Sequence, residues 1–264
     1  MFKQHLILAS AALCLAVSAH AGTVYLADST GNLWSGDPVT GIFALVGNSS
    51  RTTAMADIDF KSDGTLWGVG NDNNLYSINQ ITGAGTLIGG TGVGFLAGLA
   101  GDDAGHLYGG GVNNIYTINT TTGAGTVVGT GGGGYNVSGD LEFIGTHLYL
   151  TSTGPGSAGG GGLWSVNTTT GVGTYIGDTT FTAVWGLAYD TQNGVLYGFT
   201  SNAAEIAINP ATGAGTFLFA NVISTANGNQ LLGAAFQPAV PEPATFILFG
   251  FGVSVLGLLR QRRK

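Results

Sequence analysis

LYSINQITGAGTLIG at residues 75–89 and IYTINTTTGAGTVVG at residues 115–129 are two copies of one segment, and this segment decides the fold. In each copy two short runs of β-forming residues flank an Asn-x-x-Thr-Gly turn, a pattern typical of a β-hairpin whose glycine takes a positive φ. Three more copies, one of them with Asp in place of Asn, are LWSGDPVTGIFALVG (33–47), LWSVNTTTGVGTYIG (163–177) and EIAINPATGAGTFLF (205–219). The Thr-Gly pairs recur every 40 to 48 residues, at Thr40, Thr82, Thr122, Thr170 and Thr212.

Two further short runs precede four of the five segments. The nearer runs are LWGVG (66–70), LYGGG (107–111), LYLTS (148–152) and LYGFT (196–200). The more distant runs cover residues 55–60, 96–101, 138–143 and 185–190. Each repeat therefore predicts four short strands, and a four-stranded repeat of about 40 to 50 residues is typical of a β-propeller blade.

The two ends of the repeat region predict how the ring closes. The first repeat lacks its innermost run, whereas LLGAAFQ at residues 231–237 is an innermost run with no repeat after it. Joined with residues 23–28 and the segment at 33–47, it completes a fifth blade and leaves no free edge. We therefore predict an all-β, five-bladed β-propeller over residues 22–239, closed by N- and C-terminal strands. A sandwich does not explain the period, and a β-solenoid would not need a split repeat.

The N-terminus has the three parts of a secretory signal peptide. Lys3 supplies positive charge, residues 6–17 are apolar, and Ala19 and Ala21 form an A-x-A cleavage site. We predict a signal peptide at residues 1–21, and hence entry into the Sec machinery. The single cysteine, Cys14, lies within it, so the mature chain has no disulfide and no cysteine-based metal or catalytic site.

The C-terminus predicts a membrane anchor preceded by an extended peptide. Val240, Pro241, Glu242 and Pro243 come before sixteen uncharged residues, 244–259, and the chain ends in an Arg- and Lys-rich cluster. The uncharged run suits a transmembrane helix, and the basic cluster would hold the end in the cytoplasm with the repeats outside. The prolines disfavour helix around Glu242, and an extended peptide at the membrane edge suits a protease.

This order of Pro-Glu-Pro, apolar helix and basic end resembles the PEP-CTERM sorting signal of Gram-negative bacteria. The resemblance covers residues 240–264, and it implies processing by a membrane exosortase. It also implies transient residence in the inner membrane, then delivery to the cell surface or the extracellular space, on cells that produce exopolysaccharide. It says nothing of what the repeats do.

The charge of the middle section excludes one class of partner. Residues 22–239 contain two basic residues, Arg51 and Lys61, against thirteen acidic ones, a formal net charge of −11. An exported domain this acidic repels phosphate backbones, so we expect no nucleic-acid binding.

Four carboxylates stand out among the innermost runs. Asp57 and Asp59, and likewise Asp140 and Glu142, are two residues apart, which places each pair on one face of its strand. The other repeats have small residues there, namely Gly98, Gly186 and Gly233 at the first position and Ala100, Ala188 and Ala235 at the second. Four carboxylates near a narrow axis need compensation, which a bound Ca²⁺ would provide. The alternative, which we favour, is that backbone amides of the next blade bind them.

Recurring aromatic residues and the two mature histidines have simpler interpretations. Because aromatic residues recur at two repeat positions, we expect them to pack between blades rather than to stack on sugars. These residues are Trp34, Tyr76, Tyr116 and Trp164 at one position, and Trp67, Tyr108, Tyr149 and Tyr197 at the other. His106 and His147 precede second strands without any accompanying metal or triad pattern, so we expect exposed turn residues.

Two function classes remain open. The first is a non-catalytic surface or matrix protein that binds or scaffolds exopolysaccharide or another envelope component. The second is a glycosidase-like enzyme that uses the central carboxylates as acid and base or nucleophile, an idea that rests on fold analogy. The near-identical blades carry no enlarged catalytic loops, which favours the first class.

Overall fold

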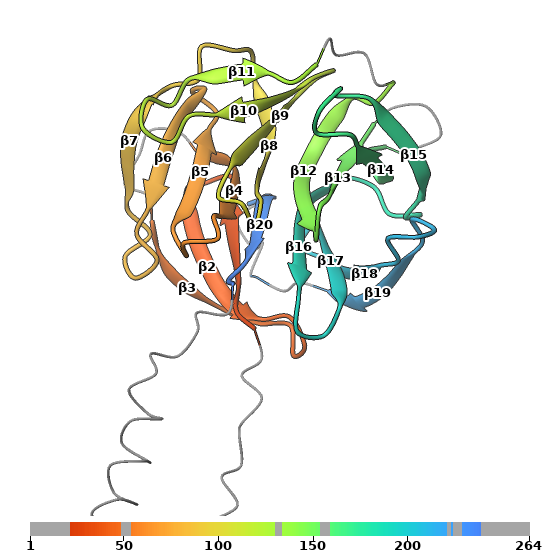
Figure 1. Cartoon of the computed structure of the whole chain (residues 1–264). Coiled ribbons are helices and arrows are strands. Elements are labelled where there is room, and N and C mark those ends of the chain that lie inside the picture. The colour runs from red at the N-terminus through yellow and green to blue at the C-terminus, as the bar shows by residue number, and fades with distance from the viewer. Residues whose placement is uncertain are drawn as a thin grey trace, which may run out of the picture.

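The chain forms a ring of five four-stranded antiparallel sheets (Figure 1). The structure is a computed structural model that describes residues 22–48, 54–129, 134–153, 159–220, 223 and 229–238. All regular structure in these ranges is β-strand, so the predicted all-β, five-bladed propeller is confirmed. The predicted signal peptide and the predicted C-terminal helix lie outside the described residues.

The strands of the described ranges fall into four concentric positions, and blades 1 to 5 follow the order of their innermost strands along the chain. The innermost strands are β4 (Met55–Phe60), β8 (Leu96–Gly101), β12 (Val137–Ile144), β16 (Val184–Asp190) and β20 (Leu231–Phe236). The second strands are β5 (Leu66–Gly70), β9 (Leu107–Gly111), β13 (His147–Ser152), β17 (Val195–Thr200) and β1 (Val24–Asp28). The third strands are β6 (Asn74–Ile78), β10 (Ile115–Ile118), β14 (Gly162–Val166), β18 (Glu205–Ile208) and β2 (Asn32–Asp37). The outermost strands are β7 (Gly85–Gly90), β11 (Gly125–Val127), β15 (Gly173–Asp178), β19 (Gly215–Phe219) and β3 (Ile42–Asn48).

Blade 5 is closed by both ends of the described chain, as predicted. β1 pairs antiparallel with β20, with Val24 opposite Phe236 and Ala27 opposite Gly233. The Gln237 amide extends this pairing by donating to the Thr23 carbonyl at 2.8 Å. The five innermost strands then contact one another in sequence around the ring, so the sheet system has no open end.

The repeated turn explains the hairpin between the third and outermost strands of each blade. In blade 1 the Asn79 side-chain oxygen accepts hydrogen bonds from the Ile81 and Thr82 amides, and Gly83 takes a φ of 74°. A side chain would strain that conformation, which is why the turn requires glycine.

The last residue of each repeated segment lies at the contact between two neighbouring blades, at their outer ends. A Cβ on Gly89 would lie 2.2 Å from the Thr122 carbonyl oxygen of the next blade, so only glycine fits there. The last segment breaks this rule, because Phe219 occupies the position and its ring lies against Gly41 of blade 5. An aromatic ring therefore fills the outer end of the contact between blades 4 and 5.

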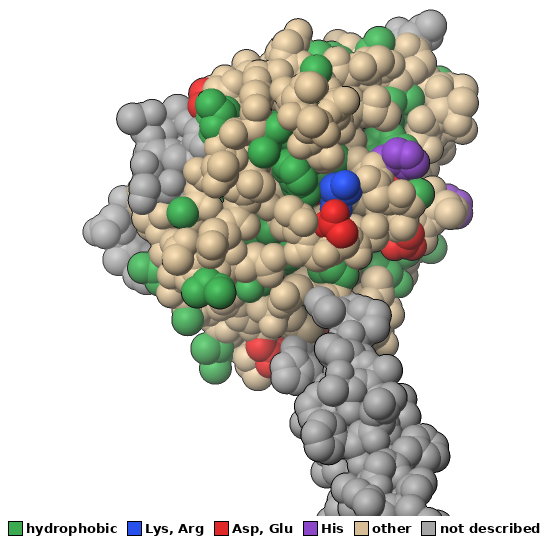
Figure 2. Space-filling model, turned by 60° about the vertical axis from the view of Figure 1, so that its left-hand side comes forward, with side chains coloured by type: hydrophobic (Ala, Val, Ile, Leu, Met, Phe, Trp, Pro, Cys, Tyr) green, Lys and Arg blue, Asp and Glu red, His purple; other side chains and the backbone are tan. Residues whose placement is uncertain are grey.

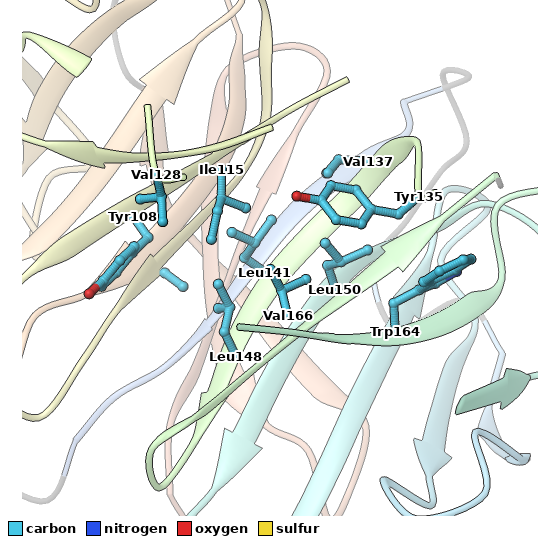
Figure 3. Close-up of a cluster of buried hydrophobic side chains, with 11 residues drawn as sticks. Tyr108, Ile115, Val128, Tyr135, Val137, Leu141, Leu148, Leu150, Trp164 and Val166 are labelled. Carbon is cyan, nitrogen blue, oxygen red and sulfur yellow. The ribbon is translucent and has the colours of Figure 1, made fainter. Parts of the chain in front are cut away.

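Apolar cores lie between adjacent blades rather than within one sheet. Figure 3 shows one of them, in which Leu141 and Leu148 of blade 3 meet Tyr108 and Ile115 of blade 2. The recurring aromatic residues belong to these cores: Trp67, Tyr76, Tyr108, Trp164 and Tyr197 are buried. The prediction that they pack between blades is thus confirmed for these five.

The face of the propeller seen in Figure 2 carries few charged groups. Within the described ranges Lys61 is the single basic residue, and its ammonium lies 3.8 Å from a carboxylate oxygen of Asp63. Among the same residues no helix is long and apolar enough to span a membrane.

Candidate functional site

The centre of the ring is filled by two aspartates, Asp57 and Asp140, which we call the axial pair. Both carboxyl groups are fully buried. The Asp57 oxygens accept hydrogen bonds from the amides of Ile58 at 2.8 Å and Leu99 at 2.6 Å. The Asp140 oxygens accept from Leu141 at 2.6 Å, Leu187 at 2.7 Å and Ala234 at 3.3 Å.

These five amides occupy the same position in the five innermost strands. The inner edge of each innermost strand has no neighbouring strand, so its amides lack a partner from the sheet. The two carboxyl groups of the axial pair therefore accept, between them, one hydrogen bond from an inward-pointing N–H of each blade. This is the backbone-bonded arrangement that the sequence favoured, and it extends to a blade that is not adjacent to the acid.

The glycines at the same strand position explain why only blades 1 and 3 carry these acids. Each aspartate reaches the next blade, where Gly98 follows Asp57 and Gly186 follows Asp140 around the ring. A Cβ on Gly233 would lie 2.1 Å from Asp57 Oδ1, and one on Gly98 would lie 2.3 Å from Leu141 Cδ1. At Gly233 and Gly98 a side chain would therefore collide with the neighbouring blade, which requires glycine at this level in blades 5 and 2.

The surroundings of the axial pair favour the protonated form of both carboxyl groups. Burial raises the pKa of Asp57 and of Asp140 well above the usual range, and the charge of Asp57 raises that of Asp140 further. Two carboxylates held this close in a buried site repel each other. The axis therefore disfavours two full negative charges on this pair.

Asp59 and Glu142, the mouth pair, lie one step further along the same strands. Two residues along a strand correspond to about 7 Å. Asp59 Oδ2 accepts from the Gly101 amide at 2.6 Å, and Glu142 Oε2 accepts from the Tyr189 amide at 3.2 Å. Burial raises the pKa of Asp59 to about 8. Burial and the charges of Asp59 and Asp140 raise the pKa of Glu142 well above its ordinary value.

The mouth pair opens into a pocket of about 390 Å³, the mouth pocket, at the carboxyl ends of the innermost strands. The residue that follows the second acidic position lines it in all five blades: Phe60, Gly101, Phe143, Tyr189 and Phe236. The rim adds Lys61, Ser62, Asp102, Asp103, Gly145, Thr191 and Pro238. The axial pair does not line the pocket, so only the mouth pair can meet a ligand.

The suggested Ca²⁺ site on Asp57, Asp59, Asp140 and Glu142 stays a prediction. Among the described residues no group of three or more His, Cys, Asp or Glu side chains is arranged to hold a metal ion. The oxygens of the axial pair are occupied by the amides described above. A cation would therefore have to bind from the pocket side, at the mouth pair.

The two histidines lie away from the floor of the pocket. His106 and His147 are exposed, and His106 Nδ1 lies 2.8 Å from a carboxylate oxygen of Asp102 on the pocket rim. The predicted exposure is confirmed for both, but His147 is the first residue of strand β13 rather than a turn residue.

A further buried carboxyl group, Glu205, was not predicted from the sequence. It is fully buried in blade 4, and neither of its oxygens has a hydrogen-bond partner among the described residues. Burial and the charge of Asp37 raise its pKa to about 8. The sequence does contain a sign of this group, because Glu205 is the first residue of its repeated segment. The other four copies have an aliphatic residue there, namely Leu33, Leu75, Ile115 and Leu163.

Comparison with known families identifies the end of the chain. Residues 239–264 match the PEP-CTERM protein-sorting motif. The chain carries a PEP-CTERM sorting signal. The resemblance seen at Val240, Pro241, Glu242 and Pro243 is thus confirmed, although these residues lie outside the described ranges. The motif implies an exported protein that an exosortase recognises and sorts to the cell surface.

Comparison with solved structures supports the propeller architecture. A chain of a crystallised nidogen/laminin complex superposes with a TM-score of 0.54 at 11% sequence identity, covering 83% of this chain and 100% of that chain. A second structure comes from work titled "The de novo evolutionary emergence of a symmetrical protein is shaped by folding constraints". It has a TM-score of 0.51 at 20% identity and covers 80% of this chain and 93% of that chain. At these identities the likeness concerns the fold alone, and no curated protein sequence matches the chain.

Proposed function

We propose that this PEP-CTERM protein is a non-catalytic component of the cell surface or extracellular matrix whose propeller binds a glycan, such as exopolysaccharide, in the mouth pocket. The observation that carries the proposal is the mouth pocket itself. This pocket combines aromatic side chains with buried carboxyl groups on one face of the ring, at the carboxyl ends of the innermost strands.

The lining of the mouth pocket suits a sugar ring. Four innermost strands contribute an aromatic residue, and Phe143 and Tyr189 are half-buried, so their rings remain partly available. Sugars have C–H faces that pack on aromatic rings and hydroxyl groups that pair with carboxyl groups and backbone.

The electrostatics of the mouth pair favour a neutral ligand. With a pKa of about 8, Asp59 is largely protonated near neutral pH, and the raised pKa of Glu142 acts in the same direction. A protonated carboxyl group both donates and accepts hydrogen bonds, as a sugar hydroxyl does. The acidic domain also disfavours polyanions, so the proposal includes no nucleic-acid partner.

A glycosidase-like activity is the alternative. Glycoside hydrolysis uses one ionised and one protonated carboxyl group, whose environments push their pKa values apart. In this pocket burial raises the pKa of both Asp59 and Glu142, which leaves neither well suited to act as base or nucleophile at neutral pH. We therefore prefer the binding function.

The export route forms the second half of the proposal. A signal peptide at residues 1–21 would direct Sec export, and residues 244–259 would hold the precursor in the inner membrane. An exosortase would then cut near residues 240–243, because the motif immediately precedes the anchor. Mass spectrometry of surface protein should find C-termini in this region, whereas mature chains that retain residues 260–264 would contradict the route.

Glycan binding can be tested with protein recovered from the cell surface and exopolysaccharide purified from the producing cells. We expect Tyr189→Ala, which removes a ring from the mouth pocket, to weaken binding about tenfold. Tyr175→Ala, which removes a ring from outermost strand β15, should leave binding unchanged. Equal binding by both variants, or no binding by the wild type, would refute the proposal. Release of reducing sugars that is lost in Glu142→Gln would instead establish the enzyme.

A further inference from the structure

The wall of the mouth pocket is built by all five blades. Each blade contributes the residue that follows the second acidic position and at least one residue from the segment after its innermost strand. The latter are Lys61 and Ser62 in blade 1, Asp102 and Asp103 in blade 2, Gly145 in blade 3, Thr191 in blade 4 and Pro238 in blade 5. The described residues therefore surround the pocket on every side.

The rim of the pocket stands well above the mouth pair. The Lys61 amide donates to the Thr65 carbonyl at 3.0 Å. The equivalent bond in blade 2 joins the Asp102 amide to the His106 carbonyl, also at 3.0 Å. The backbone pairing of these blades thus continues for one residue beyond their innermost strands. A strand advances about 7 Å over two residues, so Lys61 on the rim stands roughly that far above Asp59 on the floor.

The floor of the pocket is closed. Asp57 and Asp140 fill the axis one step below the mouth pair, and both are fully buried. All the residues that line the pocket belong to the carboxyl ends of the innermost strands or to the segments that follow them, so the pocket does not continue through the ring. Its volume of about 390 Å³ is near the lower end of the range for small-molecule sites, roughly 300 to 1,000 Å³. The pocket therefore has room for a few sugar units and not for a stretch of polymer.

We propose that the mouth pocket recognises the terminal sugar unit of a glycan chain or branch, and not units in the interior of the chain. This rests on the proposed glycan function of the pocket. An interior unit is linked on two sides, so the chain would have to fold back on itself between the walls before that unit could reach the mouth pair. A terminal unit has one linkage, which leaves through the open side while its hydroxyl groups pair with Asp59 and Glu142. The protein therefore holds chain ends and does not coat the chain.

The test compares long and short chains of the same glycan. Exopolysaccharide purified from the producing cells is cut by mild acid hydrolysis and separated by size, and methylation analysis counts the terminal units per gram in each fraction. Isothermal titration calorimetry with protein recovered from the cell surface then gives two quantities for each fraction. These are the amount of protein bound per gram at saturation and the Kd, expressed per terminal unit.

We expect the amount of protein bound per gram to follow the number of terminal units, so that a fraction with about ten times as many should bind about ten times as much protein. The Kd should stay the same within about twofold, because units beyond the rim make no contact with the pocket. An amount bound per gram that does not rise as the chains shorten would overturn the proposal and leave glycan binding intact. Absence of binding by the intact glycan and by every fraction would refute the proposed function, and this proposal with it.

Two variants provide the controls. Tyr189→Ala removes a ring from the pocket wall, and we expect it to weaken binding of the longest and the shortest fractions by the same factor. Tyr175→Ala, on outermost strand β15, should change neither the Kd nor the amount bound. A loss in Tyr189→Ala that is confined to the long chains would show that interior units occupy the pocket, and it would overturn the proposal.

Discussion

The axial pair and the mouth pair are two sets of carboxyl groups on the same two strands, one step apart, with different surroundings. Asp57 and Asp140 each have both oxygens bound by backbone amides, and neither lines a pocket. Asp59 and Glu142 are bound by amides of the next blade and face the mouth pocket. The residue types are alike, and position along the axis separates a structural role from the proposed binding role.

The difference teaches that an acidic cluster in a propeller axis has to be interpreted level by level. At the axial level each blade presents an amide without a sheet partner, and the acids complete the backbone hydrogen bonding. At the mouth level the carboxyl groups face the mouth pocket, which is open to solvent. Some of their hydrogen-bonding capacity therefore remains available to a ligand.

The largest expected effect comes from removing the charge of the axial pair. Asp57→Asn or Asp140→Asn replaces an acceptor oxygen with an NH₂ group that faces a backbone N–H. We expect each variant to lose roughly 2 to 4 kcal/mol in the free energy of unfolding, measured by denaturant titration.

Asp59→Asn is the matched control for the axial variants. Its amide oxygen can keep the bond from Gly101 while its NH₂ group faces the mouth pocket, so we expect a loss below about 1 kcal/mol. Equal losses at the two levels would remove the distinction between the pairs.

The next effect is a dependence of stability on pH. The pKa values of both pairs and of Glu205 are raised in the folded state, so the folded protein binds more protons than the unfolded chain above about pH 4. Stability is then greatest near pH 4 and is lost as the pH rises through about 8. Melting temperatures measured between about pH 5 and pH 9 should fall steadily, and a rise over this range would show that the carboxyl groups are ionised in the folded state.

A smaller gain in stability is expected at Glu205, a buried carboxyl group that has neither the amides of the axial pair nor the pocket of the mouth pair. Glu205→Leu restores the residue type of the other repeats and removes two unpartnered oxygens. We expect about 1 to 3 kcal/mol of added stability, with a larger gain at pH 9 than at pH 6. Glu205→Gln keeps a buried polar group and should not reproduce this gain, and a loss of stability in Glu205→Leu would point to a partner for the carboxyl group.

The smallest effect concerns calcium. Because amides already occupy the axial oxygens, we expect millimolar Ca²⁺ to leave the melting temperature unchanged within error. A clear rise that Asp59→Asn abolishes, while the same variant remains folded, would establish a cation site at the mouth pair.

Much of this architecture could be predicted from the sequence because the physical constraints repeat. The Thr-Gly turns recur wherever a hairpin needs a positive φ, and the unpaired run at 231–237 revealed the closing strand. The two levels within the acidic cluster could not be predicted, because Asp57 and Asp59 look alike until the ring radius and the pocket are known. Glu205 breaks the repeat visibly, yet its lack of partners depends on contacts between blades that no local pattern encodes.

Closure of blade 5 has a consequence for the order of events during export. Blades 1 to 4 each pair strands that are close in sequence, whereas Val24 can meet Phe236 only after the whole domain has been synthesised. Contacts of such long sequence separation form late, so we expect the ring to stay open until the last strand has been made. A chain cut short anywhere before residue 231 lacks the strand that finishes the domain. It also lacks the sorting signal that follows, so we expect defective copies to be left both unfolded and unsorted, and therefore exposed to proteases.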